Sequence, residues 1–300
     1  MLAIIIPYFK LTFFRKTLHS LAEQTNKRFH VYIGNDASLE NPEKLLKEFT
    51  GKFNFTYKSF DTNLGGTSLV KQWERCIALS NDEKWLMILG DDDVMGNNVV
   101  EEFYEAIATF GGSCNVVRNA SVLINENEET ISKIYKNPLY EDAIASYCKK
   151  LKGDSRGSLS EYIYRMKSYK KYGFRAYDMA WGSDDRAVID FSEGKPIYST
   201  DAVVYVRMSA INISGNTENV QEKIDARLEV TKDLLQDYRH VMTQDQIKTF
   251  VDLYEFLIYK SNKLNIEHFF YFMKISIKYF GLPYSIKILK SSIHKLYSRK

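Results

Sequence analysis

The stretch "WLMILGDDDVMGNN", residues 85–98, decides the fold of this chain. It begins as a short apolar run and continues directly into three consecutive aspartates. A short, continuously apolar run is typical of a strand that is buried on both faces of a parallel sheet. Adjacent carboxylates repel one another, so the strand ends either in a solvated acidic turn or at a place where a cation belongs.

The chain before this stretch repeats the pattern of strand, helix and strand. Such repeats predict a parallel sheet with right-handed crossover connections, and therefore an α/β fold. The expected strands before residue 85 are 2–9, 29–38 and 53–60, and the expected helices are 13–24, 40–49 and 68–80.

The second half of the chain has a different pattern. Residues 115–135 predict a long strand or a hairpin, and a basic, tyrosine-rich helical stretch then continues to Tyr172. Residues 196–208 predict one or two further strands. From Glu218 to the end, the pattern is helical almost throughout.

Composition excludes several classes of protein. With 41 Lys and Arg against 38 Asp and Glu, the net charge is +3, which does not favour binding to nucleic acid. Three scattered cysteines and five scattered histidines favour a reducing compartment without a disulfide framework or a zinc site. The first residues lack the features of a signal peptide, and no stretch is apolar for long enough to span a membrane. We therefore expect a cytoplasmic protein.

Polar residues follow three of the expected strands. These are Tyr8, Asp36 and the run Asp91–Asp93. Parallel sheets bind ligands outside the carboxyl ends of their strands, so these residues are candidates for one binding site. Carboxylate oxygens suit Mg²⁺ or Mn²⁺, and substrate phosphates often complete the coordination shell of magnesium.

Five motifs in this order resemble family 2 glycosyltransferases with the GT-A fold, and bacterial surface-polysaccharide glycosyltransferases among them. They are "AIIIPYF" (3–9), "GNDAS" (34–38), "NLGG" (63–66), "LGDDD" (89–93) and "WGSDD" (181–185). The resemblance implies a Rossmann-like, mainly parallel sheet with flanking helices. It also implies a GT-A domain over residues 1–215, divided into a nucleotide-binding half (1–110) and an acceptor-binding half (111–215). A helical extension over 216–300 follows.

The resemblance assigns expected roles to individual residues. Asp36 is expected to accept a hydrogen bond from a pyrimidine base. Asn63 and Lys71 are weaker candidates for contacts to base, ribose or phosphate. The stretch that the family places around the nucleotide corresponds here to Pro7, Tyr8 and Phe9.

The aspartate run aligns with the family's metal-binding motif in two ways. Aligning Leu89 with the family's leucine puts Asp92 at the metal position, while sliding by one residue makes the pair Asp91 and Asp93. We favour Asp92 as ligand of Mn²⁺ or Mg²⁺, Asp91 facing the ribose or a metal-bound water, and Asp93 as support. Gly90 stands where many members have an aspartate.

Sugar transfer with inversion needs a carboxylate to take the proton of the acceptor hydroxyl. In the family this residue lies about ten positions before a glycine that ends a helix. Gly194 then favours Asp184 as the catalytic base. Asp185 is the second candidate, or a helix N-terminal residue that the helix dipole favours. Arg207 either approaches the diphosphate or forms a structural salt bridge.

Residues 268–300 contain seven Lys and Arg and no Asp or Glu. Basic and aromatic residues on amphipathic helices suit the surface of an anionic membrane. The alternative is a helical cap that packs on its own domain or on a second subunit, as in a homodimer. Membrane contact would place the protein peripherally at the inner face of the cell membrane.

The leading hypothesis is therefore an inverting, metal-dependent glycosyltransferase of polysaccharide biosynthesis. Its expected partners are a nucleotide-sugar donor, a UDP-hexose by preference, and a glycan or lipid-linked acceptor. One alternative is a non-catalytic binding or scaffold protein with the same fold. A sugar-nucleotide pyrophosphorylase is less favoured, because "PYFKLTFFRK" (7–16) lacks the glycines of the phosphate-binding loop that such enzymes carry after the first strand.

Overall fold

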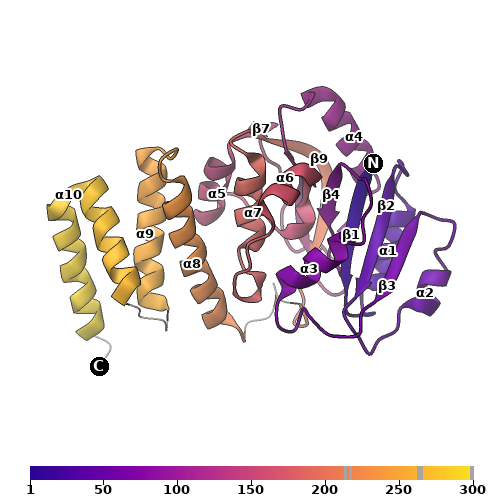
Figure 1. The fold of residues 1–300 in the computed structure, drawn as a ribbon, viewed down its shortest axis with the longest axis horizontal. Coiled ribbons are helices and arrows are strands. Elements are labelled where there is room, and N and C mark those ends of the chain that lie inside the picture. The colour runs from indigo at the N-terminus through magenta and orange to yellow at the C-terminus, as the bar shows by residue number, and fades with distance from the viewer. Residues whose placement is uncertain (213–214, 216–217, 262–265, 298–300) are drawn as a thin grey trace. The chain divides into compact units, whose positions relative to one another are not determined.

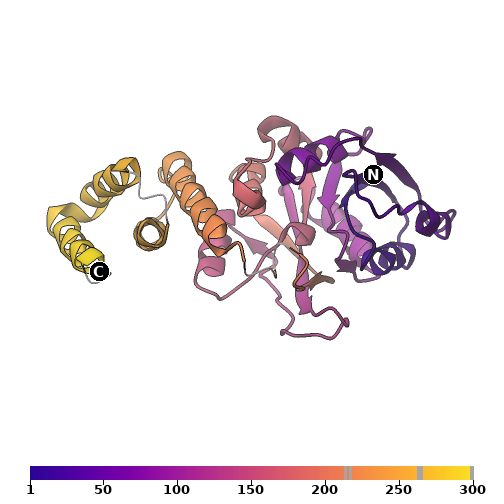
Figure 2. The same cartoon turned by 90° about the horizontal axis from the view of Figure 1, so that it is seen from below.

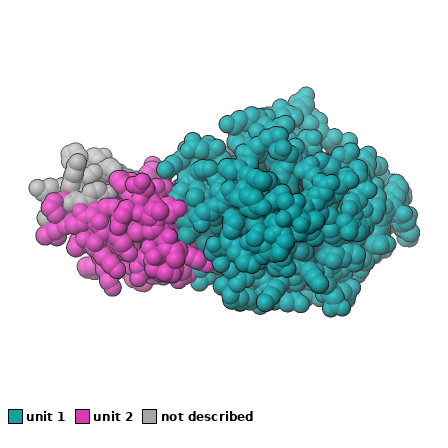
Figure 3. Space-filling view, turned by 90° about the horizontal axis from the view of Figure 1, so that it is seen from above, with its two compact units in different colours: residues 1–176, 183–217 teal, residues 177–182, 218–300 magenta. Residues whose placement is uncertain are grey.

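The computed structural model describes residues 1–212, 215, 218–261 and 266–297, and it divides into two compact units. Unit 1 comprises residues 1–176 and 183–217, and unit 2 comprises residues 177–182 and 218–300 (Figure 3). The short segment Tyr177–Gly182 thus belongs with the C-terminal helices, although unit 1 continues on both sides of it in the sequence.

Unit 1 is built on one mixed sheet, which contains nine strands in the described part of the chain. The strand order is β3-β2-β1-β4-β8-β6-β9-β5, with β7 paired to β9. The first four positions are mutually parallel, whereas β8 runs antiparallel to both of its neighbours. The strands are β1 (Leu2–Tyr8), β2 (Phe29–Asn35), β3 (Phe55–Ser59), β4 (Trp85–Ile88), β5 (Val94–Met95), β6 (Val116–Ile124), β7 (Tyr140–Glu141), β8 (Tyr162–Arg165) and β9 (Ile197–Arg207).

Helices flank this sheet on both faces (Figures 1 and 2). The helices of unit 1 are α1 (Phe14–Ala22), α2 (Glu43–Lys47), α3 (Leu69–Ile77), α4 (Val99–Phe110), α5 (Ala143–Leu151), α6 (Met166–Tyr172) and α7 (Ser183–Ser192), with a 3₁₀ turn, η1 (Leu159–Glu161). The expected α/β fold, with a mostly parallel central sheet and extra helices at the C-terminus, is confirmed.

The alternation of side chains along β1 explains the two layers of helices. Leu2, Ile4 and Ile6 lie in one apolar core with residues of α1 and α4. The intervening residues point to the opposite face, where α3 contacts β1 and β2. There Gly34 is needed, because a Cβ atom on it would come within 2.2 Å of the Cys76 sulfur. Every residue of β1 apart from Pro7 is buried, as expected for a central strand.

The first four strands lie within the ranges expected from the sequence, whereas the short later strands β5, β7 and β8 were missed. The four residues of β8 lie between η1 and α6, inside a stretch that was expected to be helical. Yet β8 occupies the middle of the sheet and joins the parallel half to β6. A four-residue strand shows too few alternations to be recognised, so its partners β4 and β6 determine its conformation.

A buried polar cluster ties β6 to the helix that follows β7. The Arg118 side chain is fully buried and donates hydrogen bonds to Ser146 (2.5 Å), Ser199 (3.0 Å) and Glu141 (2.8 Å). Glu141 also pairs with Lys149, which is half exposed. Because both ends of the Arg118–Glu141 pair are shielded from water, removing one end leaves an uncompensated charge in the interior.

Unit 2 consists of helices. It contains η2 (Asp178–Ala180), α8 (Val220–Tyr238), α9 (Gln244–Lys260) and α10 (Ile266–Tyr297), and α10 is kinked at Gly281. A capping box starts α9, in which Thr243 and Gln246 bond each other's backbone amides. Over the described ranges, no helix combines the length and the apolarity needed to cross a membrane.

Replacing Arg118 by Met should destabilise unit 1 by about 3–5 kcal/mol, because Glu141 then loses its buried partner. Urea unfolding followed by circular dichroism measures this loss. The matched control is Lys149→Met, which removes the exposed partner of the same carboxylate and should cost about 0–1 kcal/mol. Equal losses in the two variants would show that burial of Arg118 does not govern the strength of this cluster.

Candidate active site

The aspartate run after β4 is anchored to the loop that follows β1. One carboxylate oxygen of Asp91 accepts hydrogen bonds from the backbone amides of Phe9 (2.7 Å) and Lys10 (2.9 Å). The Thr17 hydroxyl, on α1, donates to the backbone carbonyls of Asp91 and Asp93. The carboxyl ends of the parallel strands β1 and β4 are thus linked by hydrogen bonds to the aspartates. Asp91 therefore has a structural role.

Asp93 fastens the run to the far side of the sheet. It is buried, and its carboxylate accepts the backbone amide of Arg207 at the end of β9 (2.9 Å). The Arg207 side chain is itself buried and donates to the carbonyls of Asp92 (2.9 Å) and Asn125 (2.8 Å). These contacts favour a structural role for Arg207 over an approach to the diphosphate. Its main interactions are hydrogen bonds to backbone carbonyls, however, and not the expected salt bridge.

Asp92 has a different kind of partner from its two neighbours. Its carboxylate accepts a hydrogen bond from the side-chain amide of Asn212 (3.0 Å), which also donates to the Arg207 carbonyl (2.6 Å). Unlike Asp91 and Asp93, Asp92 is thus bound by a side-chain amide rather than by the backbone amide of a residue from another element. Sequence reasoning did not identify Asn212, because nothing in the pattern connects it with a residue 120 positions earlier.

Gly90 explains how the carboxylates come close together. A Cβ atom at this position would lie 2.8 Å from an oxygen of Asp92 and 3.1 Å from one of Asp93. Its amide donates to the Ser160 hydroxyl (3.0 Å) in η1. The glycine that departs from the family motif thus leaves room for the two carboxylates that follow it.

The three aspartates are electrostatically unfavourable as ionised groups. Burial and the neighbouring Asp92 carboxylate raise the pKa of Asp91 to about 7 and that of Asp93 to about 7. Burial also raises the pKa of Asp92, against the hydrogen bond from Asn212 that lowers it. Such crowding of carboxylates favours a bound cation or bound protons.

Asp36, directly after β2, is a second buried carboxylate at the same edge of the sheet. Its two oxygens accept the amides of Leu64 (2.7 Å) and Gly65 (2.8 Å), and it forms an ion pair with Arg75 of α3. The Arg75 guanidinium also lies 4.0 Å from the ring centre of Phe60. The "NLGG" loop is therefore shaped around Asp36. Sequence reasoning considered Lys71 in this helix and missed Arg75, one further helical turn along the same helix.

The stretch Pro7–Phe9 divides between core and surface. The Tyr8 ring is fully buried against Phe14, and its hydroxyl donates to the Glu40 carbonyl (2.6 Å). Pro7 is half-buried, whereas the Phe9 ring is 40% exposed. Phe9 is therefore the aromatic ring of this stretch that a ligand can reach, and the Tyr8 ring contributes to the core.

The two weaker candidates for ligand contacts, Asn63 and Lys71, both lie at the surface. The side-chain oxygen of Asn63 accepts the amide of Gly66 (2.6 Å), so it closes the turn of the loop. Lys71 lies in the first turn of α3, where its amide bonds the Ser68 hydroxyl that caps the helix. Its exposed side chain lies at a helix N-terminus, which favours anionic groups nearby.

Asp184 and Asp185 lie in the first turn of α7. Asp185 forms an ion pair with Lys150 of α5 at 2.5 Å. Burial and the Asp185 carboxylate raise the pKa of Asp184 to about 6, while Lys150 lowers it. A carboxylate with such a pKa is largely ionised at neutral pH and remains basic enough to accept a proton.

Strand β8 links these aspartates to the run after β4. The Ser160 hydroxyl, two residues before β8, hydrogen-bonds the Asp93 carboxylate and lowers its pKa. Within β8, burial and the Asp184 carboxylate raise the pKa of Tyr164, whose hydroxyl is buried without a hydrogen-bond partner in the described residues. Residues of the segment 160–164 therefore interact with carboxylates of both motifs.

Comparisons with known proteins agree with this architecture. The structure of S. aureus TarS 1–349 in complex with UDP-GlcNAc matches with a TM-score of 0.66 and 13% identity, covering 93% of this chain and 80% of that chain. The same protein in complex with UDP gives a TM-score of 0.64 and 13% identity, covering 91% and 80%. At this identity the likeness shows the fold. A comparison with curated protein sequences found no match.

A family model settles the membership of the chain. The model described as "Glycosyl transferase family 2" matches residues 3–177, which include β1 to β8 and four of the five motifs. More than half of the chain is covered by this match. The chain therefore belongs to glycosyl transferase family 2 and is a glycosyltransferase.

Proposed function

We propose that this enzyme is an inverting, metal-dependent glycosyltransferase that transfers a sugar from a UDP-sugar to a glycan or lipid-linked acceptor in polysaccharide biosynthesis. The observation that carries the proposal is the crowding of Asp91, Asp92 and Asp93 at the end of β4, with raised pKa values for all three. A divalent cation that binds there together with a diphosphate would offset the repulsion between the carboxylates.

The donor nucleotide is proposed to bind between Asp36 and the loop after β1. An ionised carboxylate has about four acceptor positions, and Asp36 uses three of them for Leu64, Gly65 and Arg75. One position remains for the imide of a pyrimidine base. Phe9 offers its exposed ring and Pro7 its half-buried one. The solved relative that contains UDP supports this choice of nucleotide.

Other contacts to the donor involve residues at the same edge of the sheet. Asn63 and Lys71 are proposed to contact the ribose and the phosphates. The backbone of Tyr8 is a further candidate, because its carbonyl accepts the Asp36 amide (3.1 Å) and so lies beside Asp36. Asp91 faces the ribose or a metal-bound water in this proposal. The solved relative in complex with UDP-GlcNAc supports a UDP-linked amino sugar as the first donor to test.

The residues present fit Mn²⁺ or Mg²⁺ when a diphosphate supplies further oxygens. Within the part of the chain that the structure describes, no group of three His, Cys, Asp or Glu is arranged as a protein-only metal site. One or two carboxylates suffice for magnesium, however, when phosphate oxygens and waters complete its shell. Asp92 is the proposed ligand, because the side chain that bonds its carboxylate is the neutral amide of Asn212, with Asp91 and Asp93 in support. When bound, the ion would offset the charge of the departing diphosphate.

Asp184 is the proposed catalytic base. In an in-line displacement the acceptor hydroxyl attacks the anomeric carbon from the face opposite the leaving nucleotide, and the configuration of that carbon inverts. A carboxylate must take the hydroxyl proton during this step. Asp185 is the weaker candidate for this role, because its carboxylate is engaged by Lys150.

Contact with an anionic membrane is proposed for α10. Its first half exposes Ile266, Phe270 and Ile277, which fall on one stripe of the helix, while Lys274 and Lys278 are exposed beside them. Residues 268–300 carry seven basic and no acidic residues, while the whole chain has a net charge of only +3. A self-association through this face would bring like charges together, whereas an anionic lipid surface is complementary to it. A membrane location suits a lipid-linked acceptor.

Asp92→Ala should abolish Mn²⁺-dependent binding of UDP, because it removes the proposed metal ligand. Isothermal calorimetry with UDP, with and without Mn²⁺, measures this. The matched control is Asp82→Ala, which removes an exposed carboxylate just before β4 and should leave binding unchanged. Metal-dependent binding at wild-type strength in Asp92→Ala would show that other residues hold the ion.

Asp184→Asn should lower transfer by about 100-fold or more, the range in which general bases contribute, while UDP binding stays within twofold. Release of UDP from UDP-GlcNAc, in the presence of a bacterial membrane extract as acceptor, reports transfer. Asp185→Asn serves as the comparison. If Asp184→Asn transfers sugar at the wild-type rate, Asp184 is not the base.

The double variant Lys274→Glu/Lys278→Glu should weaken binding to vesicles of phosphatidylglycerol and phosphatidylcholine by about tenfold or more, since each basic residue near an anionic surface contributes about 1 kcal/mol. Vesicle flotation measures binding. The control variant, Lys248→Glu/Lys260→Glu, makes the same charge change on exposed positions of α9. A wild-type chain that does not float with the anionic vesicles would refute membrane contact.

A further inference from the structure

The two adjacent aspartates of α7 have different surroundings. Lys150, in the last turn of α5, donates to the Asp185 carboxylate at 2.5 Å and to the Gly157 carbonyl at 2.8 Å. No hydrogen bond from another side chain reaches Asp184 in the described residues. Lys150 thus distinguishes between two carboxylates that are neighbours in the sequence.

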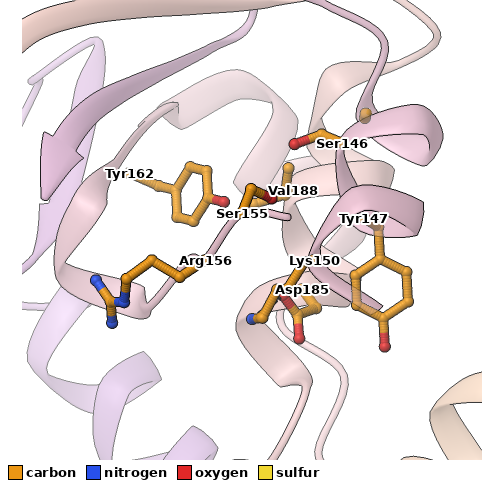
Figure 4. Close-up of a pocket in the computed structure, with 9 residues that line it drawn as sticks. Ser146, Tyr147, Lys150, Ser155, Arg156, Tyr162, Asp185 and Val188 are labelled. Atoms are coloured by element: carbon orange, nitrogen blue, oxygen red, sulfur yellow. Dashed lines mark hydrogen bonds and ion pairs between the residues drawn. The ribbon is translucent and has the colours of Figure 1, made fainter. Parts of the chain in front are cut away.

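The surroundings of Lys150 hold its ammonium group in place. Lys150 and Asp185 lie side by side in the wall of a polar pocket that Ser155, Arg156 and Tyr162 also line (Figure 4). The pocket encloses about 10 Å³, which is about the room that one water molecule needs. The Lys150 ammonium donates to two acceptors in this wall, so the ion pair is part of the structure of the site.

The charged and titratable groups that influence Asp184 come from three elements of unit 1. Asp185 on α7 is a like charge, Lys150 on α5 is an opposite charge, and Tyr164 on β8 is neutral at physiological pH. Although burial alone would lower the pKa of Lys150, the carboxylates of Asp185 and Asp184 raise it, so the ammonium remains charged. It therefore acts on both aspartates.

We propose that Lys150 is a positioning residue for sugar transfer, which fixes Asp185 in an ion pair and leaves Asp184 as the carboxylate that takes the acceptor's proton. This inference rests on the proposed role of Asp184 as base. Lys150 does not touch the reacting atoms in this mechanism. Its contribution is to set which of the two carboxylates is available, and to keep that carboxylate ionised.

The consequences for proton binding have a definite sign. Lys150 stabilises the ionised form of Asp184, so replacing it by the uncharged Met should raise the pKa of Asp184 above about 6. Asp185→Asn removes the repelling carboxylate and should lower it. In Lys150→Met/Asp185→Asn both charges are absent, so the pKa should return towards the wild-type value.

Carboxyl ¹³C NMR titration of the full chain labelled at aspartate tests this without a substrate. The Asp184 signal is assigned by its loss in Asp184→Asn. Lys150→Met should move its midpoint upward by about 1 pH unit, and Lys150→Arg, which keeps the charge, should restore the wild-type midpoint. The control is Lys149→Met, the neighbouring lysine on α5, which pairs with Glu141 and should leave the midpoint unchanged.

Activity adds an independent readout. The acidic limb of the pH profile of kcat/KM for UDP-GlcNAc turnover should shift to higher pH in Lys150→Met by the same amount as the NMR midpoint. An unchanged Asp184 midpoint in Lys150→Met would overturn the role of Lys150. If Lys150→Met does not fold, Asp185→Asn takes its place, and an unchanged Asp184 midpoint in that variant would overturn the same role. Retained transfer in Asp184→Asn would instead overturn the base assignment, so the two failures are distinguishable.

Discussion

The repulsion between three consecutive carboxylates is the constraint on which this site depends. The fold contains it by giving the outer two aspartates backbone partners: Asp91 accepts two amides from the loop after β1, and Asp93 accepts the amide of Arg207 at the end of β9. Amide donors favour the ionised form of a carboxylate but supply no net charge. The run is therefore fixed in position, while its charge is left for a bound cation or bound protons to balance.

A carboxylate that accepts backbone amides of a neighbouring loop occurs again after β2. Asp36 shapes the "NLGG" loop by accepting the amides of Leu64 and Gly65, and there Arg75 supplies a compensating charge. The contrast between the two sites is informative. A carboxylate paired with a guanidinium is suited to recognising a neutral base, whereas carboxylates without a cationic partner of their own are suited to binding a metal ion.

The sequence predicted what depends on local pattern and missed what depends on contacts between distant residues. The first four strands and the carboxylates that follow two of them are predicted by short-range periodicity and known motifs. Arg75, Asn212 and Lys150 act through partners 39, 120 and 35 positions away, so no local spacing points to them. Strand β8 was missed for the same reason, since its four residues are ordered by β4 and β6 rather than by their own pattern.

Each acidic motif thus contains one carboxylate that is less firmly held than its neighbours. The Asp92 carboxylate accepts from a neutral side-chain amide, whereas Asp91 accepts backbone amides of the loop after β1 and Asp93 accepts the backbone amide of Arg207. Asp184 stands beside Asp185, which an ammonium holds. A ligand that displaces a partner must replace the interaction it breaks, and breaking a backbone anchor also disturbs the strand ends. The carboxylate with the weakest partner therefore binds a metal ion or a proton with the smallest loss of existing interactions. This favours Asp92 as metal ligand and Asp184 as base.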